Sequence, residues 1–273
     1  MVEKKFFAID LDGTLLTWNK KLTQRNLEAL LKIQAEGHKI AFLTGRDIVN
    51  VTSFAKKAKL DTYGGYIGAY NGGLVYSCKE DQIIKESFFD PDLVLEIKEY
   101  LEKLNLDFTF LRPREQYISK KAYLPFSLYR KLNGKKTYPI DELFTKNLHV
   151  NKILVNDTKS KLLKVWAKLE NKFSGKISIS MSSIISIELT PAGSDKGAAL
   201  EYLASLENIN MSNTIAIGNQ GNDLPMLKKA GKAIVVNNAS KNIKDQADLI
   251  IPSNNKKGVG IYLERFLEDK WKN

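Results

Sequence analysis

The stretch FFAIDLDGTLL, residues 6–16, places two acidic residues around one leucine, directly after an apolar run. Successive side chains of a strand point to opposite faces, so Asp10 and Asp12 are predicted to project to the same side. In an open α/β sheet the ligand binds beyond the carboxyl ends of the strands, where these two acids would lie. The stretch predicts either a turn at Gly13 whose acids have no chemical role, or a pair of catalytic carboxylates.

Two other kinds of ion or phosphate site do not fit the sequence. A calcium loop needs glycine at its sixth position and a bidentate glutamate at its twelfth. Counted from Asp10, the glycine is fourth and the twelfth residue is Lys21. The sequence also contains no P-loop signature, so a nucleotide-driven machine of that kind is not indicated.

The composition is that of a globular protein. The chain has 273 residues, of which 43% are hydrophobic and 27% charged, and this length allows two domains. The formal net charge of +11 fits an anionic substrate, a nucleic acid or a lysine-rich surface. Because no basic stripe or aromatic-basic motif accompanies the charge, we favour the lysine-rich surface and expect no nucleic-acid partner.

A single cysteine, Cys78, cannot form an internal disulfide, which suits a reducing cytoplasm. The N-terminal run reaches an acid before a signal-like apolar core develops, and no apolar stretch approaches the length that spans a bilayer. We therefore expect a cytoplasmic protein without a membrane partner. The sequence does not fix the oligomeric state, and a monomer is slightly favoured.

Apolar runs alternate with stretches of helical spacing in both halves of the chain, which predicts a doubly wound parallel sheet of the α/β class. In the first helix Thr23 is a candidate cap and Gly37 a candidate stop. The predicted strands are 5–9, 38–46, 65–71, 213–219, 232–236 and 248–252, and the predicted helices are 22–37, 47–58, 195–206, 223–231 and a closing helix from about 258.

The pattern changes between these halves. A helix beginning at DPDLVLEIKEYLEKL is followed by DFTFL, QYIS and a Tyr- and Lys-rich stretch, and then by further strands up to IISIEL. This segment predicts an inserted α+β domain at 80–186. Residues 1–79 and 187–273 would form the core.

Polar motifs follow the predicted core strands: DLDGT at 10–14, TGR at 44–46, NGG at 71–73 and GNQGND at 218–223, with Lys196 in GSDKG ahead of the late strand. In this order, the acids, the hydroxyl, the lysine and the late motif resemble the haloacid dehalogenase superfamily. The insertion after the third strand and the sequence IELTPAGSDKG are similar to the Cof-type branch, which has a large α/β cap that sets specificity. The resemblance covers essentially the whole chain.

The resemblance implies a role for each acid of the first motif. Asp10 would attack phosphorus and form an aspartyl-phosphate, a form of covalent catalysis that carboxylates perform. Asp12 would protonate the leaving alcohol and then take a proton from the attacking water. Spacing by two on one strand face would supply both groups from one rigid element.

The resemblance also implies Mg²⁺, because paired acids would otherwise repel a phosphate dianion. The expected ligands are Asp10, the backbone carbonyl of Asp12, Asn219 and Asp223. Relatives usually have an acid at the position of Asn219, and we expect the neutral amide oxygen either to bind Mg²⁺ more weakly or to shift the direct contact to Asp223.

Further residues are expected to bind the phosphate. Lys196 and Thr44 would stabilise the transferring phosphoryl group and count with the two acids as catalytic. The remaining candidates for the substrate or phosphate are Gly45, Arg46, Asn71, Asn222 and Asn238. Five of these residues have a simpler structural interpretation, since Thr44 could cap a helix, Lys196 could be solvated, Arg46 could pair with a surface acid, and Asn71 and Asn238 could belong to turns.

We expect a Mg²⁺-dependent phosphatase that acts on a small phosphorylated metabolite, a sugar phosphate or a phosphorylated cofactor. A phosphomutase and a noncatalytic anion-binding or interaction module remain alternatives. Specificity is expected in the insertion, where the candidate contacts are Arg112, Arg114, Tyr117, Tyr123 and Tyr129. His38 and His149 lack partners that suggest a metal site, and we interpret both as structural.

Overall fold

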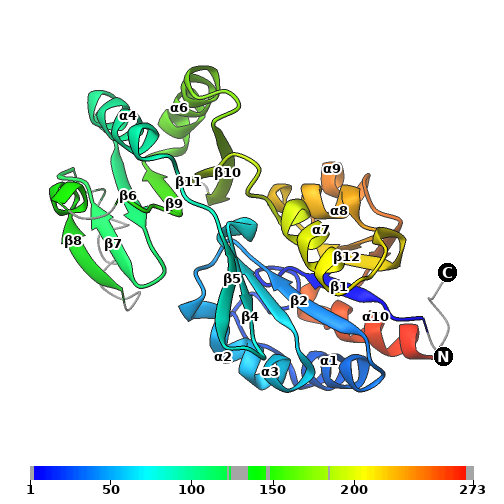
Figure 1. The fold of residues 1–273 in the computed structure, drawn as a ribbon. Helices are drawn as coiled ribbons and strands as arrows, with labels where there is room; N and C mark the ends of the chain where they lie inside the picture. Colours follow the sequence, from blue (N-terminus) through cyan, green and yellow to red (C-terminus); the bar gives the residue numbers. More distant parts are fainter. Residues whose placement is uncertain (1–2, 122, 124–134, 146–147, 184, 269–273) are drawn as a thin grey trace. The chain divides into compact units, whose positions relative to one another are not determined.

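The computed structural model describes residues 3–121, 123, 135–145, 148–183 and 185–268 (Figure 1). The chain divides into two compact units. The core unit consists of Met1–Lys85 and Asp195–Asn273, and the inserted unit consists of Glu86–Ser194.

The core unit contains an eight-stranded sheet in the order β14-β13-β12-β1-β2-β3-β4-β5. The strands from β14 to β3 are parallel, and β4 runs antiparallel to β3. Their bounds are β1 Phe6–Ile9, β2 Lys39–Leu43, β3 Tyr66–Ala69, β4 Leu74–Ser77, β5 Gln82–Glu86, β12 Thr214–Gly218, β13 Lys232–Val236 and β14 Leu249–Ile251. This sheet confirms the predicted doubly wound α/β class.

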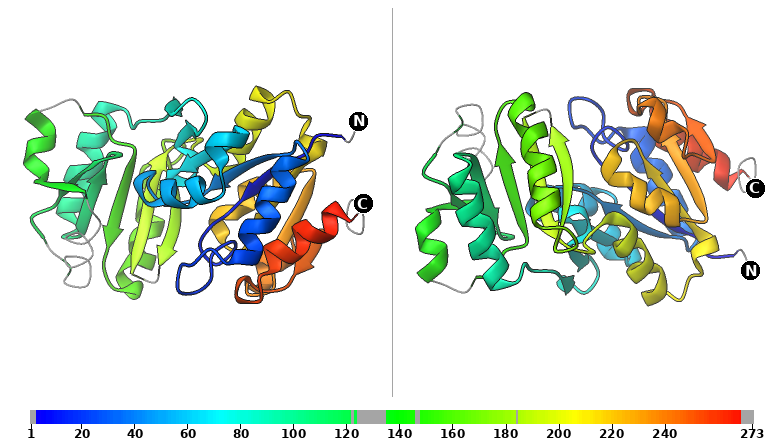
Figure 2. Two further views of the ribbon diagram at one scale, coloured as in Figure 1. Left: turned by 90° about the horizontal axis from the view of Figure 1, so that it is seen from below. Right: turned by 90° about the horizontal axis from the view of Figure 1, so that it is seen from above.

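Helices cover both faces of the core sheet, because the central strands are apolar on both sides. Phe7 and Ile9 of β1 pack in one cluster with residues of α1 and α10, whereas Phe6 and Ala8 pack in a second with residues of α7 and α8. Figure 2 shows α1 and α10 side by side, in agreement with their contacts. The core helices are α1 Gln24–Ala35, α2 Val49–Lys57, α3 Leu60–Tyr63, α7 Lys196–Leu206, α8 Leu224–Lys229, α9 Lys241–Lys244 and α10 Gly258–Leu267.

The first helix has the ends that the sequence predicts. The Thr23 hydroxyl accepts a hydrogen bond from the amide of Asn26, as an N-cap does. After the last helical residue, Gly37 has a φ of +87°, which glycine adopts without a steric penalty. The helix therefore begins directly after Thr23 and ends before Gly37, the two residues that the sequence predicts as its cap and its stop.

In its described residues, the inserted unit has a six-stranded sheet and the helices α4 and α6. The order is β10-β11-β9-β6-β7-β8, antiparallel except for the pair of β7 and β8. One face of this sheet and the apolar sides of α4 and α6 form a separate hydrophobic cluster. The bounds are α4 Pro91–Lys103, β6 Asp107–Leu111, β7 Glu115–Ile118, β8 Lys136–Pro139, β9 Lys152–Asn156, α6 Lys159–Lys172, β10 Ile177–Ser183 and β11 Ser186–Pro191.

The bounds of the insertion differ from the predicted 80–186 at both ends. β5 is the edge strand of the core sheet, and β11 pairs with β9 and β10 in the inserted sheet. β5 lacks the apolar run of a central strand, because it carries charged residues and is partly exposed, so its place in the core sheet is not visible in the sequence. β11 was predicted to belong to the core because it directly precedes the motif that contains Lys196. The unit boundaries therefore lie at 85/86 and 194/195.

Short 3-10 turns connect several of these elements: η1 Tyr70–Gly72, η2 Ile140–Thr145, η3 Met211–Asn213, η4 Gly221–Asp223 and η5 Asn254–Lys256. Among the helices of the described part of the chain, none combines the length and the apolar character that a bilayer crossing requires.

Candidate active site

The candidate site lies where the direction of strand addition changes. β1 is flanked by β2 and by β12, so the chain adds strands first on one side of β1 and later on the other. At such a switch point the connections after neighbouring strands diverge and leave room for a ligand. The motifs after β1, β2, β3 and β12 all follow the carboxyl ends of these strands.

Hydrogen bonds fix the backbone that carries the acid pair. The amide of Asp10 donates to the carbonyl of Ile217 at 3.0 Å, which extends the pairing of β1 with β12 by one residue. The carbonyl of Asp10 then accepts from the amide of Leu15 at 3.2 Å. Between them Gly13 turns the chain with a φ of +82°. Asp10 and Asp12 thus leave the sheet on a short backbone turn that is bonded at both ends.

Asp10, Lys196 and Asp223 form one buried charged cluster. Lys196 Nζ lies 2.6 Å from Asp10 Oδ1 and 2.6 Å from Asp223 Oδ1. Lys196 is the first residue of α7, and the Asp195 side chain caps that helix by accepting from the amide of Ala198. Lys196 and Asp223 are fully buried and Asp10 is 5% exposed, so the structure excludes the solvated reading of Lys196.

The cluster contains two carboxyl groups and one ammonium group, and the pKa values of both Asp10 and Lys196 are raised. Burial, followed by repulsion from Asp223, raises the pKa of Asp10 to about 7, although Lys196 acts in the opposite direction. For Lys196, burial disfavours the charged form, but the two carboxylates outweigh it and raise its pKa. The ammonium therefore stays charged, while Asp10 ionises fully only with further cationic support.

Asp12 lies in a different environment, between two cations. Arg46 Nε donates to Asp12 Oδ2 at 2.6 Å and Arg46 Nη2 donates to Oδ1 at 2.7 Å, while Lys20 Nζ donates to Oδ1 at 2.6 Å. Burial raises the pKa of Asp12, but the hydrogen bonds from Arg46 and Lys20 and their charges together hold it below its usual value. Asp12 is therefore an ionised carboxylate in this arrangement.

The ends of β2 and β3 are joined by backbone hydrogen bonds. The Thr44 amide donates to the Gly68 carbonyl, and its carbonyl accepts from the amide of Asn71, both at 2.8 Å. The Thr44 hydroxyl accepts from the amide of Arg46 at 3.2 Å, across Gly45. The structure does not bear out the alternative that Thr44 caps the next helix, because α2 begins only at Val49.

Asn71 joins the end of β3 to the late motif. It has a φ of +57°, a left-handed conformation that asparagine tolerates better than most residues. Its Oδ1 accepts from Asn222 Nδ2 at 3.0 Å. The structure thus brings Asn71 and Asn222 together.

The late motif also folds back onto the first one. Asn219 Oδ1 accepts from the Thr14 hydroxyl at 3.0 Å, and Asp223 Oδ2 accepts from the amides of Asn219 and Gln220 at 2.8 and 2.9 Å. A Cβ at Gly218 would lie 2.6 Å from that of Asp223, so the packing requires glycine there. Both carboxylate oxygens of Asp223 are therefore used within the protein.

Asn238 closes the same turn from the other side. Its Nδ2 donates to the carbonyl of Gly13 at 2.8 Å and its Oδ1 accepts from the amide of Asn254 at 3.0 Å. Of the predicted phosphate-binding residues, Asn238 and Arg46 thus contact the DLDGT segment, whereas Asn71 and Asn222 contact each other.

The oxygen donors at this end of the sheet fit a magnesium ion. No group of three His, Cys, Asp or Glu residues in the described chain could hold a metal alone, so the candidate set includes the backbone carbonyl of Asp12 and the amide of Asn219. Mg²⁺ prefers oxygen ligands of this kind and retains several waters. The buried pair Asp10 and Asp223 shares one ammonium, and the remaining negative charge favours a cation.

Sequence reasoning missed two side chains of the site, Thr14 and Lys20. The DGT triplet was the available signal for Thr14, because it places a hydroxyl directly beside the acid pair. Lys20 carried no signal, since it reaches Asp12 through the fold of the following turn.

His38 lies in the core unit, where its Nδ1 accepts a hydrogen bond from the amide of Lys5.

The candidate specificity residues that are described lie within the inserted unit. The buried Tyr117 donates its hydroxyl hydrogen to Glu115, and the guanidinium of Arg112 lies over the Tyr117 ring. The Arg114 carbonyl accepts from the amide of Lys136, and the Tyr123 amide donates to Asp107. His149 stacks on Phe88, and Tyr129 lies outside the described residues.

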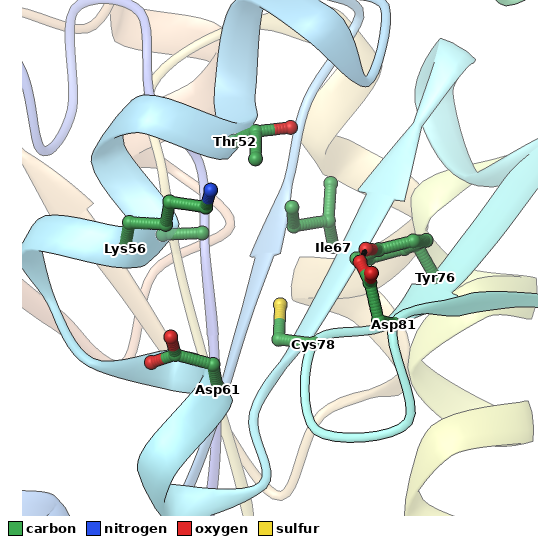
Figure 3. Close-up of a pocket in the computed structure, with 8 residues that line it drawn as sticks. Thr52, Lys56, Asp61, Ile67, Tyr76, Cys78 and Asp81 are labelled. Atoms are coloured by element: carbon green, nitrogen blue, oxygen red, sulfur yellow. Dashed lines mark hydrogen bonds between the residues drawn. The ribbon is translucent and has the colours of Figure 1, made fainter.

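A pocket of about 250 Å³ lies between α2, α3 and the β3–β4 hairpin (Figure 3). Cys78 lies within it, and burial raises the pKa of the Cys78 thiol to about 12, aided by the nearby acids Asp61, Asp81 and Glu80. Because Cys78 pairs with Gly65 just before β3, the pocket lies toward the amino ends of the parallel strands. It contains none of the predicted site residues.

The comparisons with known proteins cover nearly the whole chain. A family model described as haloacid dehalogenase-like hydrolase matches residues 7–263. The 5-amino-6-(5-phospho-D-ribitylamino)uracil phosphatase YwtE of Bacillus subtilis is 29% identical, over 98% of this chain and 99% of its own. The phosphatase YwpJ of the same organism is 25% identical, over 96% of this chain and all of its own.

A solved haloacid dehalogenase-like hydrolase from Bacteroides thetaiotaomicron superposes with a TM-score of 0.86 at 28% identity, over 97% of this chain and 100% of that one. Its fold and the matched family model both extend across the core strands and the insertion. The chain therefore belongs to the haloacid dehalogenase-like hydrolase family, in its Cof-type phosphatase branch, which confirms the family predicted from the four motifs.

Proposed function

We propose that the protein is a Mg²⁺-dependent phosphatase that hydrolyses a small phosphorylated metabolite through an aspartyl-phosphate on Asp10. The enzyme class, a phosphoric monoester hydrolase, follows from the family. The observation that supports the finer proposal best is the buried cluster of Asp10, Lys196 and Asp223 beside Asp12 at the end of β1. A binding module has no need of paired acids held in this way.

Asp10 is the proposed nucleophile. Its carboxylate oxygen would form a bond to phosphorus while the bond from phosphorus to the ester oxygen breaks. The salt bridge to Lys196 fixes the carboxylate and keeps part of its charge compensated. Because its pKa is about 7 in this environment, Asp10 needs a further positive charge to be fully ionised at neutral pH.

Asp12 is the proposed proton carrier. It would give a proton to the departing ester oxygen and later accept one from the water that attacks the phosphorylated Asp10. In the structure Arg46 and Lys20 hold Asp12 ionised, so these contacts must loosen before Asp12 can carry a proton. Protonation of Asp12 is thus linked to its conformation.

The remaining residues would bind the phosphoryl group. Lys196 and the Thr44 hydroxyl are proposed to stabilise its oxygens, together with Gly45, Arg46, Asn71, Asn222 and Asn238 around the strand ends. Mg²⁺, held by Asp10, the carbonyl of Asp12, Asn219 and Asp223, would offset the charge of the phosphate dianion. The two amide contacts to Asp223 Oδ2 would keep that side chain fixed whether it acts directly or through water.

The proposed substrate is a small phosphate monoester, such as a sugar phosphate or a phosphorylated cofactor. A relative of nearly full coverage carries the name of a phosphatase for a phosphoribitylamino uracil, which supports a polyhydroxylated phosphate as one candidate. We propose that the inserted unit selects among such esters. A cytoplasmic location is proposed from the single, buried Cys78.

The test is a turnover screen over phosphorylated sugars, phosphorylated cofactors and 5-amino-6-(5-phospho-D-ribitylamino)uracil, with and without Mg²⁺. We expect release of inorganic phosphate that requires Mg²⁺ and is lost in Asp10→Asn. Asp245→Asn is the matched control, because that acid lies in an exposed surface pair with Lys241. Mg²⁺-dependent hydrolysis that survives in folded Asp10→Asn would contradict the assignment of Asp10.

A further inference from the structure

The pocket beside Cys78 has an apolar floor. Ile67 and Tyr76 are paired directly between β3 and β4, so their side chains lie on the same face of the sheet. Ala55 of α2 packs in the same hydrophobic cluster as Ile67, and both side chains are almost fully buried. An apolar cavity of roughly 150 Å³ is enough to hold benzene, and this pocket measures about 250 Å³. The space therefore suits one six-membered ring with a short chain attached.

The Cys78 thiol forms part of the pocket wall. Cys78 is 9% exposed, and Figure 3 shows its sulfur directed into the space between Lys56 and Ile67. The Cys78 amide donates to the carbonyl of Gly65, whereas the thiol is in no disulfide and in none of the described hydrogen bonds. A buried thiol packs much like a small apolar group. A molecule in the pocket can therefore contact this thiol without displacing another partner from the described chain.

Two exposed carboxylates, Asp61 and Asp81, line the opening of the pocket. Asp61 Oδ1 accepts from the amide of Thr62 at 2.9 Å, and Asp81 Oδ1 accepts from the hydroxyl of Tyr76. Within the described part of the chain neither acid forms a salt bridge, and the Oδ2 atom of each accepts no hydrogen bond. Each acid therefore keeps one oxygen that can bind a cationic donor.

The electrostatic potential inside the pocket is negative. Burial raises the pKa of the Cys78 thiol, and the charges of Asp61, Asp81 and Glu80 raise it further. Lys56 also lines the pocket, but its side chain is exposed and its ammonium does not offset the effect of these acids on the thiol. A positively charged group is therefore favoured over a negatively charged one at this position.

We propose that this pocket binds a small molecule in which one apolar ring carries a short alkylammonium chain. The ring would lie against Ile67, Ala55 and Cys78, where its burial supplies most of the binding free energy. The ammonium would lie at the opening beside Asp61 and Asp81, and would supply the selectivity for a cation. The lining includes none of the residues proposed for the phosphatase reaction, so the inference does not depend on that reaction.

Two other interpretations of the pocket make different predictions. A hydrated crevice between α2 and the β3–β4 hairpin would bind no small molecule measurably. A site built around the ammonium of Lys56 would prefer an anion. A series of molecules with the same ring, a similar chain and a different charge separates the three interpretations.

The experiment measures the affinities of phenethylamine, phenylethanol and hydrocinnamate for the full chain by isothermal titration calorimetry. We expect the amine to bind most tightly and the carboxylate most weakly. Asp61→Asn and Asp81→Asn should each weaken the amine about two- to fivefold, the contribution of an exposed ion pair, and leave the alcohol unchanged. Asparagine tolerates the φ of +53° at residue 81. Asp245→Asn is the matched control and should change none of the three affinities, because Asp245 pairs with Lys241 outside the pocket.

Two substitutions of Cys78 test whether the amine binds in this pocket. Cys78→Phe places a ring of its own in the space proposed for the ligand and should abolish measurable binding, whereas Cys78→Ala leaves the space open and should retain it. Filling a cavity commonly preserves or raises stability, and the melting temperature of each variant shows whether it is folded. If Cys78→Phe does not fold, the two Asp variants decide the question.

Three results would overturn the proposal. Amine affinity that is unchanged in folded Cys78→Phe would place the binding elsewhere on the chain. Equal affinities for the amine and the alcohol, or a preference for the carboxylate, would remove Asp61 and Asp81 from recognition. No measurable binding of any of the three molecules would leave the pocket as a hydrated crevice.

Discussion

Gly13 shows at the scale of one residue why the first motif has its particular sequence. Its φ of +82° costs an L-residue about 1–2 kcal/mol, and a Cβ at this position would lie 2.5 Å from Asn219 Nδ2. Its carbonyl also accepts from Asn238. The glycine therefore lets the turn after Asp12 approach the late motif closely enough for Thr14 to bond Asn219.

A comparison of Gly13→Ala with Gly37→Ala should separate the cost of a positive φ from the contact that a Cβ at residue 13 would make with Asn219. Gly37 has a similar φ of +87°, and a Cβ added there would meet no atom of the described chain within 4 Å, so its variant carries only the conformational cost. We expect Gly37→Ala to lose about 1–2 kcal/mol of unfolding free energy with normal activity, whereas Gly13→Ala also displaces Asn219 and raises the Mg²⁺ concentration needed for half-maximal rate. Chemical denaturation and a magnesium titration of the initial rate measure both. Equal magnesium midpoints in the two variants would remove Asn219 from the metal site.

At the scale of elements, the site depends on how β1, α7 and η4 meet. Each contributes one member of the buried cluster, namely Asp10 after β1, Lys196 at the first turn of α7 and Asp223 at the end of η4. Two further contacts hold these elements without involving the ammonium of Lys196. The amide of Asn219 donates to Asp223, and the Asp195 side chain caps α7. The buried charges of the proposed site are therefore placed by the ends of three elements rather than by a single loop.

Lys196→Met should destabilise the fold by about 3–5 kcal/mol, because it leaves two buried carboxylates without their cation. The pKa of Asp10 is already raised to about 7, so the folded state holds a proton that the unfolded state releases above about pH 4. Loss of Lys196 raises this pKa further, and the destabilisation should therefore be largest near pH 8 and smaller near pH 5. Denaturant unfolding at both pH values is the measurement.

Lys229→Met is the control for Lys196→Met, since Lys229 pairs with Glu201 in a largely exposed salt bridge. We expect it to change the unfolding free energy by less than about 1 kcal/mol at either pH. A loss in Lys196→Met no larger than this control would show that the cluster is not electrostatically coupled in solution.

At the scale of the whole molecule, the core unit and the inserted unit each have their own hydrophobic clusters. The alternation of apolar strands and helices predicted the core sheet, because strands buried on both faces give continuous apolar runs such as residues 6–9. Edge strands are less visible in sequence. β5 is exposed at its first two residues and half-buried in the rest, and its place in the core sheet follows from pairing.

The candidate site was predictable to the extent that its residues follow strand ends. Asp10 and Asp12 directly follow the apolar run of β1. In the same way Thr44 follows β2 and Asn219 follows β12. The contacts between motifs were not predictable, because the bonds of Lys20 to Asp12 and of Asn238 to Gly13 depend on how turns fold in three dimensions. Local spacing thus identified the strand-end positions, whereas the pairing of side chains required the structure.

In the proposed reaction Asp10 carries the phosphoryl group during turnover. The most direct measurement mixes the protein with Mg²⁺ and a hydrolysed ester, stops the reaction with acid within one turnover, and analyses the peptides by mass spectrometry. We expect a phosphoryl group on the peptide that contains Asp10, present during turnover and absent after the ester is consumed. Full hydrolysis with no modification of Asp10 at any time, under conditions that preserve a known aspartyl-phosphate, would contradict it.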